Sequence, residues 1–155
     1  MIQMNDAIVL YCSLGGNTEE VAALIKEALS DRCRVHMHHV SEAPKNLPYE
    51  DSLLFLGAYT WGDGKLPAEM RKTLRRLYKE EGISPSDVAC FGTGDKMFPL
   101  YCRAVDEMEH HTVRHGLTVI GPSLKIEQSP RNKKEEVRAW AETVHDIARH
   151  HQPIL

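Results

Sequence analysis

The sequence has no long apolar stretch and no large surplus of one charge. No run approaches the roughly 18 apolar residues that a membrane-spanning helix needs, and the formal net charge is only -3. A net charge this small gives no sign of a nucleic-acid partner, because nucleic-acid binding calls for a basic patch. The opening residues, MIQMNDAIVLYC, show no basic segment followed by a long apolar one, so we expect no secretory signal. We therefore expect a cytoplasmic protein with neither a membrane nor a nucleic-acid partner.

Cysteine is also scarce and is never paired at close spacing. The four cysteines are Cys12, Cys33, Cys90 and Cys102. No C-x-x-C pair occurs among them, which argues against a zinc site or a disulfide framework and suits a reducing compartment. Burial is the usual fate of a free cysteine, so we expect Cys12 and Cys90 to be buried thiols. The sequence holds three pairs of adjacent histidines, at 38–39, 110–111 and 150–151, but no other potential ligands stand at a metal-binding spacing from them. We therefore expect no metal.

Apolar segments alternate with segments of helical periodicity along the whole chain. The expected strands are residues 7–12, 33–40, 52–60, 87–94 and 117–127, and the expected helices are residues 18–31, 67–82, 101–115 and a segment around 137–148. This alternation predicts an α/β protein in which a parallel sheet carries helices on both faces. Without repeats, low-complexity segments or a linker, residues 1–155 are expected to form a single domain.

Three loops are expected to meet at one edge of this sheet. Residues 13–18, 61–66 and 94–101 follow the first, third and fourth strands. The carboxyl ends of parallel strands share one edge, and ligands bind there at the point where the strand order reverses. We therefore expect a ligand site built from these three loops.

The first of these loops reads SLGGNT. Its glycines would let backbone N–H groups surround an anion at the start of a helix, and Ser13, Asn17 and Thr18 add side-chain donors. A Walker lysine and a G-x-G-x-x-G pattern are both absent, which disfavours nucleoside triphosphate hydrolysis and dinucleotide binding. A phosphate site and a plain strand-to-helix turn explain the glycines equally well.

The other two loops carry aromatic side chains. Trp61 stands at a strand end between a threonine and a glycine, and leaving so large a side chain in water costs free energy unless a helix or a planar ligand covers it. The third loop holds Phe98 and Tyr101. Two aromatic loops facing a phosphate loop would form a slot for a flat, phosphorylated heterocycle.

The ordered motifs SLGGNT, TWGDG and FGTGDKMFPLYC resemble those of flavodoxins over essentially the whole chain. The expected strand at 117–127 has no long insertion, so the resemblance is to the short-chain type. It implies a doubly wound five-stranded parallel sheet of order 2-1-3-4-5 and a non-covalently bound FMN. It also implies a monomeric redox carrier, not an enzyme, that shuttles single electrons at low potential between a flavodoxin reductase and redox acceptor proteins.

The resemblance also implies which residues contact FMN. The phosphate would be held by Ser13, Leu14, Gly15, Gly16, Asn17 and Thr18. One side of the ring would be lined by Thr60, Trp61, Gly62, Asp63 and Gly64, and the other side by Thr93, Gly94, Asp95, Phe98, Tyr101 and Cys102. The Gly62 carbonyl is expected to turn toward flavin N5 on reduction. Gly15 replaces a threonine that is common in the family loop, so one hydroxyl donor to the phosphate is lost. Phe98 replaces the usual tyrosine, so stacking on the ring is kept but the phenol is lost. Both replacements affect the expected affinity for FMN.

Two alternative functions use the same cofactor. One is a flavodoxin-like activator of manganese ribonucleotide reductase, and the other is a small FMN-dependent reductase, which would need a site for NAD(P)H. A separate feature is the basic character of the helix at 67–82, which carries Arg71, Lys72, Arg75, Arg76 and Lys79. That face is either solvated and balanced by acidic neighbours or a docking surface for an acidic partner.

Overall fold

The computed structural model describes residues 6–61 and 63–151. Its strands are β1 (Asp6–Cys12), β2 (Arg34–His39), β3 (Leu53–Tyr59), β4 (Asp87–Gly94) and β5 (Leu124–Glu127). Its helices are α1 (Asn17–Leu29), α2 (Ala68–Leu74), the π-helix η1 (Arg75–Glu80), α3 (Arg103–Arg114) and α4 (Lys134–His150).

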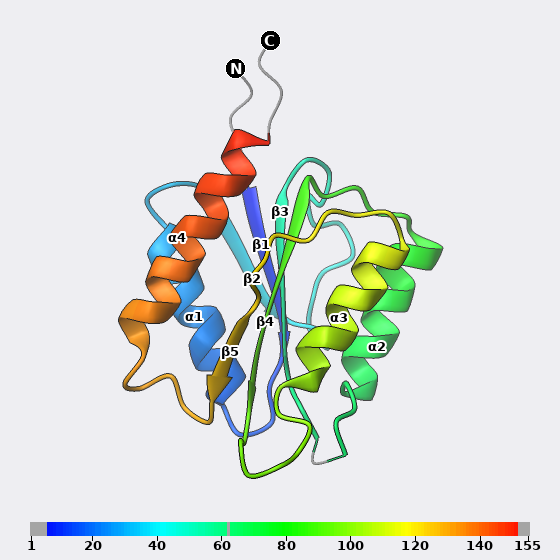
Figure 1. The fold of residues 1–155 in the computed structure, drawn as a ribbon. Coiled ribbons are helices and arrows are strands. Elements are labelled where there is room, and N and C mark those ends of the chain that lie inside the picture. The colour runs from blue at the N-terminus through cyan, green and yellow to red at the C-terminus, as the bar shows by residue number, and fades with distance from the viewer. Residues whose placement is uncertain (1–5, 62, 152–155) are drawn as a thin grey trace.

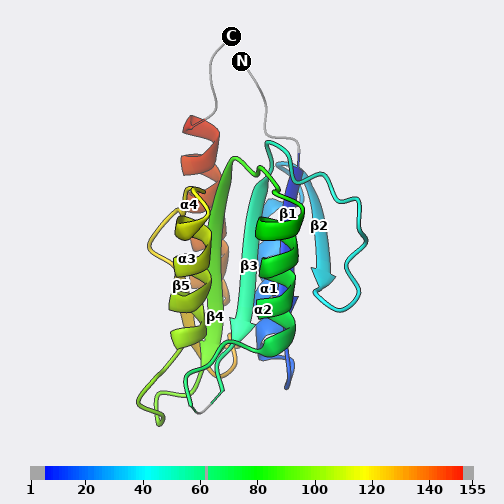
Figure 2. The same ribbon diagram turned by 90° about the vertical axis from the view of Figure 1, so that its right-hand side faces the viewer.

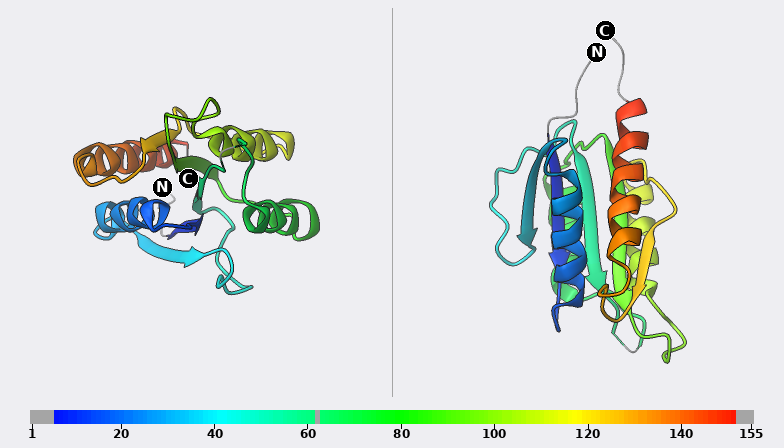
Figure 3. Two further views of the ribbon diagram at one scale, coloured as in Figure 1. Left: turned by 90° about the horizontal axis from the view of Figure 1, so that it is seen from below. Right: turned by 90° about the vertical axis from the view of Figure 1, so that its left-hand side faces the viewer.

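The strands form one parallel sheet in the order β2-β1-β3-β4-β5, which confirms the predicted fold class. Helices α1 and α4 lie on one face of the sheet, and α2 and α3 lie on the other (Figure 1). The view along the strands shows the same three layers, with a pair of helices on each side (Figure 3).

Burial on both faces explains the continuous apolar run of β1. Successive side chains of a strand point to opposite faces, so Val9 packs among the residues of α1 and α4, while Ile8 and Leu10 pack among those of α2 and α3. All three are fully buried. By contrast, β2 lies at the edge of the sheet, and its residues are partly or fully exposed.

The last strand is shorter than predicted, because the sheet pairing of residues 117–127 is interrupted. Val119 forms an isolated bridge with Val88, and regular pairing resumes only where Leu124 lies opposite Phe91. Pro122 stands between the two and has no N–H to donate to a ladder, so the chain leaves the sheet there. The interruption is a short turn, not an inserted segment.

The helix expected at 67–82 also differs from the prediction. It is α-helical only as far as Leu74 and continues as the π-helix η1. The wider turn is seen where the Glu81 N–H donates to the Arg76 carbonyl, five residues back, at 2.8 Å. The segment ends before Gly82, whose φ of 59° lies in the left-handed region that glycine adopts readily.

The cysteines are buried where the sequence predicts it. Cys12 and Cys90 are buried as predicted, Cys102 is buried as well, and all four cysteines are free thiols. Across the described segments, no helix has the length and apolar character required to cross a bilayer.

Candidate functional site at the carboxyl edge of the sheet

The strand register brings three loops to one level. Cys12 lies opposite Ala58 in the β1–β3 pair, and Tyr59 lies opposite Thr93 in the β3–β4 pair. The first loop (13–16), the second loop (60–67) and the third loop (95–102) therefore leave the sheet side by side, at the bottom of Figures 1 and 2. We call these three loops, with the first turn of α1, the rim.

The first loop presents unpaired backbone donors. Gly16 has a φ of 93° and precedes α1, and the Ser13 hydroxyl oxygen accepts the N–H groups of Gly16 at 3.1 Å and Glu19 at 3.3 Å. Within the described residues, the backbone N–H groups of Asn17 and Thr18 have no acceptor. A Cβ atom added at Gly15 or Gly16 would meet nothing within 4 Å. The start of α1 is thus open to an anion, with N–H groups and the helix dipole aimed at it.

The side chain of Thr18 joins the first loop to the end of β4. Its hydroxyl lies 2.8 Å from that of Thr93, and both residues are buried. These two predicted binding residues therefore lie beneath the surface of the rim. Of the two, Thr18 can still offer its backbone N–H.

Trp61 is the main feature of the second loop. Its side chain is 48% exposed and touches Tyr59 edge-on at 5.4 Å between ring centroids. A turn holds it in place, because the Gly64 N–H donates to the Trp61 carbonyl at 2.8 Å and the Lys65 N–H to the Asp63 carboxylate at 3.2 Å. Gly62 lies outside the described residues, and so does its predicted carbonyl rotation.

The second loop packs against the third loop and is anchored to α3. A Cβ atom on Gly64 would lie 2.5 Å from a methyl of Leu100, so the two loops touch there. Thr60 accepts the Ala104 N–H at 3.1 Å, and Glu107 accepts the Leu66 N–H at 3.3 Å. The position of Trp61 therefore depends on α3 as well as on β3.

Glu107 is a supporting residue that the sequence reasoning missed. It also accepts a hydrogen bond from Arg71 at 3.2 Å. Burial acts to raise the pKa of Glu107, but the hydrogen bonds from Arg71 and Leu66 outweigh it and lower the pKa. The carboxylate thus stays charged and holds α2, α3 and the second loop together. Its position in the middle of a polar helix gave no sign of this role.

The third loop is organised by Asp95. The Asp95 carboxylate accepts the Met97 N–H at 2.8 Å, and its backbone carbonyl accepts the Phe98 N–H at 3.1 Å. The side chain thus serves a local turn. Beyond it, Phe98 is 51% exposed, and Lys96 lies 5.6 Å from the centre of the partly buried Tyr101 ring. Burial raises the pKa of the Tyr101 phenol, which stays neutral.

The cysteines near the rim are not activated. Cys102 has a φ of 52° at the start of α3, and its thiol is buried and points to the Ile126 carbonyl at 4.0 Å. Burial raises its pKa, and burial with nearby Glu69 raises the pKa of Cys12 to about 12. Both thiols are protonated at neutral pH, so neither is a nucleophile there.

Exposed apolar side chains gather on the rim. In the described residues the large apolar side chains that stand exposed are Leu14, Trp61, Met97, Phe98 and Val113, and all but Val113 belong to the three loops. Met97 was missed at the sequence level, although an apolar residue in a loop rich in glycine and proline is a usable signal. An apolar cluster of this kind marks a surface that a ligand or partner covers.

The fold is that of a doubly wound α/β protein, and at the carboxyl edge of its sheet the rim combines an open helix start with exposed aromatic side chains. A family model described as flavodoxin matches residues 9–140. The probable flavodoxin 2 of Bacillus subtilis is 34% identical over 137 residues, covering 86% of this chain and 89% of that protein. The chain therefore belongs to the flavodoxin family.

Solved structures agree with this assignment. The oxidised flavodoxin 2 of Bacillus cereus is 32% identical with a TM-score of 0.79, covering 92% of this chain and 99% of that one. A short-chain flavodoxin associated with a non-canonical PDU bacterial microcompartment is 25% identical with a TM-score of 0.82, covering 94% and 99%. The predicted family and its short-chain type are confirmed. The family supports an FMN-dependent electron carrier and not an enzyme, and the two alternative functions are not favoured.

Proposed function

We propose that the rim binds FMN and that the chain shuttles single electrons at low potential between a reductase and acceptor proteins. The observation that carries the proposal is the gathering of Leu14, Trp61, Met97 and Phe98 beside the open start of α1. FMN has the matching parts, namely a flat apolar ring system and one phosphate.

The phosphate fits the first loop. The free N–H groups of Asn17 and Thr18 would donate to it, with further donors from the Ser13 hydroxyl and the Asn17 amide. Gly15 and Gly16 leave room for an anion to approach the backbone. The loop carries no cationic side chain, so binding rests on the helix N-terminus and hydrogen bonds.

The ring fits between the second and third loops. Trp61 and Phe98 would cover its faces, and Leu14 and Met97 would shield its edges from water. The other proposed contact residues are Thr60, Gly62, Asp63 and Gly64 of the second loop and Thr93, Gly94, Asp95, Tyr101 and Cys102 around the third. Thr93 and Cys102 would take part through their backbone, because their side chains are buried. Bound FMN would supply the one-electron redox chemistry, while these residues bind it and exclude water.

The charges of the rim favour a low potential. Asp63 and Asp95 disfavour added negative charge in the slot. The Lys65 ammonium lies 3.9 Å from the Asp63 carboxylate and offsets part of its charge, but the Lys65 side chain is 70% exposed, so water screens this compensation. Lys96 is likewise exposed and lies over Tyr101.

We also propose the setting in which the carrier works. An exposed rim suits transient docking of a flavodoxin reductase and of redox acceptor proteins, each in turn, to a monomer. Four free thiols suit the reducing conditions of the cytoplasm. We infer a single domain over residues 1–155, since the described elements share one sheet.

Flavin binding tests the proposal directly. We expect FMN fluorescence to be quenched on titration with the FMN-free chain, and riboflavin, which lacks the phosphate, to bind at least about a hundredfold more weakly, given the usual value of hydrogen bonds to a charged group. Anaerobic electrochemistry on the complex should then give reversible one-electron steps. A chain that takes up neither flavin would overturn the proposal, and equal affinity for the two would overturn the phosphate site.

A further inference from the structure

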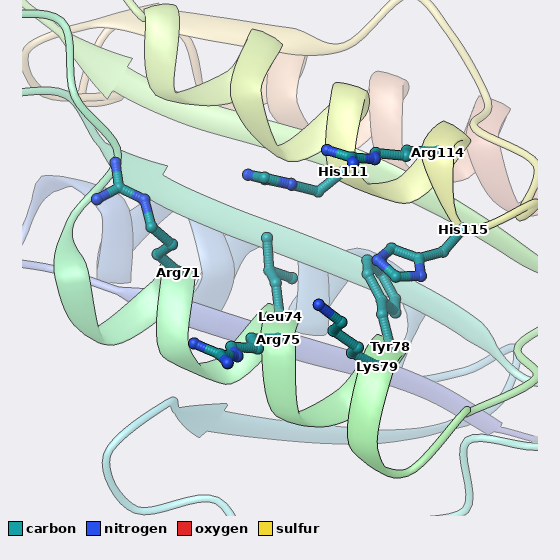
Figure 4. A pocket seen from close by; sticks show the side chains of 8 residues that line it. All are labelled: Arg71, Leu74, Arg75, Tyr78, Lys79, His111, Arg114 and His115. Carbon is teal, nitrogen blue, oxygen red and sulfur yellow. The ribbon is translucent and has the colours of Figure 1, made fainter.

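A cavity of about 400 Å³ lies away from the rim, between α2 with η1 on one side and α3 on the other (Figure 4). Its lining residues are Arg71, Leu74, Arg75, Tyr78, Lys79, His111, Arg114 and His115. The volume falls in the range of small-molecule sites, roughly 300–1,000 Å³. The flavodoxin function does not use this cavity.

The charge on its wall is largely uncompensated. Four of the lining side chains are cationic, yet Arg71 is the one with a carboxylate partner, Glu107 at 3.2 Å. Among the described residues, Arg75, Lys79 and Arg114 have no carboxylate within 4.0 Å. A chain with a net charge of -3 thus gathers three unpaired cations and two histidines around one hollow. Such crowding of like charge is unfavourable until an anion enters.

The inner part of the cavity is apolar. Leu74 and Tyr78 are buried, and Figure 4 shows both side chains rising from their helix between the two walls. The Tyr78 hydroxyl is already bonded to Thr112 at 2.8 Å, so the ring, not the hydroxyl, is what a ligand would meet. The His115 ring lies 5.4 Å from that of Tyr78 at an angle of 42°. A ligand with a flat body fits this part better than a bare inorganic ion does.

The backbone of the wall is itself unusual. Arg75, Tyr78 and Lys79 all belong to the π-helix η1. Such segments are rare and are found frequently at functional sites. This backbone feature and the cavity are independent observations on the same residues.

We propose that this cavity is a second binding site, which takes a small polyanion with a flat apolar body, of the class of nucleoside diphosphates. Arginine side chains suit the phosphoryl groups, since their planar forks donate two hydrogen bonds at once. The cations surround a concave hollow of small-ligand size and are not spread over a flat face, which favours a small molecule over an acidic segment of a protein partner.

Calorimetric titration of the FMN-loaded chain with ADP tests the site, because the filled rim cannot accept the nucleotide. We expect ADP to bind at least about tenfold more tightly than adenosine or inorganic phosphate, and its binding to weaken as salt is added. Arg75→Glu and Lys79→Glu should each weaken ADP binding by about tenfold or more. Lys72→Glu changes the net charge equally on the same helix but lies outside the cavity, and it should leave binding unchanged.

Three results would overturn the site. One is no ADP binding at millimolar concentration in low salt. Another is an equal loss in Lys72→Glu, which would mean a diffuse electrostatic effect. The third is tighter binding of poly-glutamate than of ADP with the same dependence on Arg75 and Lys79, which would assign the surface to an acidic protein partner. FMN content, recorded for every variant, keeps these outcomes separate from the behaviour of the rim.

Discussion

Trp61 and Phe98 expose about half of their side chains, whereas the side chains of Thr18, Thr93 and Cys102 are buried. The exposed pair can contact a ligand directly. The buried side chains act on the frame instead, since the bond between the Thr18 and Thr93 hydroxyls joins the first loop to β4. At the scale of single residues, the rim therefore separates the side chains that meet FMN from those that hold the loops in place.

Removing either exposed aromatic residue should weaken FMN binding without unfolding the chain. Trp61→Ala and Phe98→Ala are each expected to raise the FMN dissociation constant by about tenfold, ~1.4 kcal/mol, because an apolar cover of the ring is lost. Fluorescence titration measures this, with Val113→Ala as the control, since Val113 is exposed on α3 away from the rim. Unchanged affinity in both aromatic variants would remove Trp61 and Phe98 from the proposed site.

At the scale of helices and strands, the sequence predicted the order of elements and the position of the three loops well. Apolar runs such as that of β1 are long and sharply bounded, and parallel strands leave little choice about where their carboxyl ends lie. The prediction of one continuous strand over residues 117–127 was wrong, because Pro122 breaks the ladder between Val119 and Leu124, although a Gly-Pro pair is a recognised turn signal.

The π-helix and the cavity were beyond the reach of sequence patterns. The apolar spacing from the end of α2 into η1 fits an α-helix as well as a π-helix, so Leu74, Leu77 and Tyr78 predict the same buried face in either case. The cavity combines Arg75 with Arg114, which are far apart in the chain and meet only because α3 packs beside α2. Likewise, the resemblance to flavodoxins identified the residues of the rim. Only the packing in the structure shows which of those residues are buried.

The packing of β3 against β4 leaves no room for a side chain at Gly57. A Cβ atom there would lie 2.1 Å from the Phe91 ring, and that ring is fixed between the sheet and Trp140. Gly57→Ala should lower the free energy of unfolding by about 1–3 kcal/mol, the usual range for overpacking. Urea unfolding of the FMN-free chain measures the change, with Gly15→Ala as the control, since its added Cβ meets nothing within 4 Å. A Gly57→Ala variant as stable as the parent would contradict the packing described for this pair of strands.

At the scale of the whole molecule, the two faces of the sheet have different tasks. The α2 and α3 face carries the basic cavity and, through Glu107, supports the second loop. The α1 and α4 face carries none of these groups but includes a buried titratable side chain, His145 of α4. Neither ring nitrogen of His145 has a hydrogen-bond partner among the described residues. Stability at mildly acidic pH should therefore depend on this face.

Burial lowers the pKa of His145 from its ordinary 6.5, nearby Arg32 and Arg149 lower it further, and Asp146 opposes them. The folded state then binds fewer protons than the unfolded state as pH falls below about 6.5, so stability is present above that pH and is lost below it. Asp87 acts in the opposite sense at lower pH. Burial raises its pKa above 3.8 although His151 lies 2.9 Å away, so its contribution is lost as pH rises.

Replacing the buried imidazole should remove the dependence on mild acid. His145→Leu is expected to unfold with a free energy that stays nearly level as pH drops from about 6.5 to about 5, where the parent chain loses up to about 1.4 kcal/mol per pH unit. Stability at neutral pH should also rise, because two unpaired buried nitrogens are removed. Denaturant unfolding at a series of pH values measures both effects, and His110→Leu, which removes an exposed imidazole from α3, should follow the parent curve. If His145→Leu kept the slope of the parent, the acid sensitivity would have to come from another group, and a neutral, buried His145 would no longer explain it.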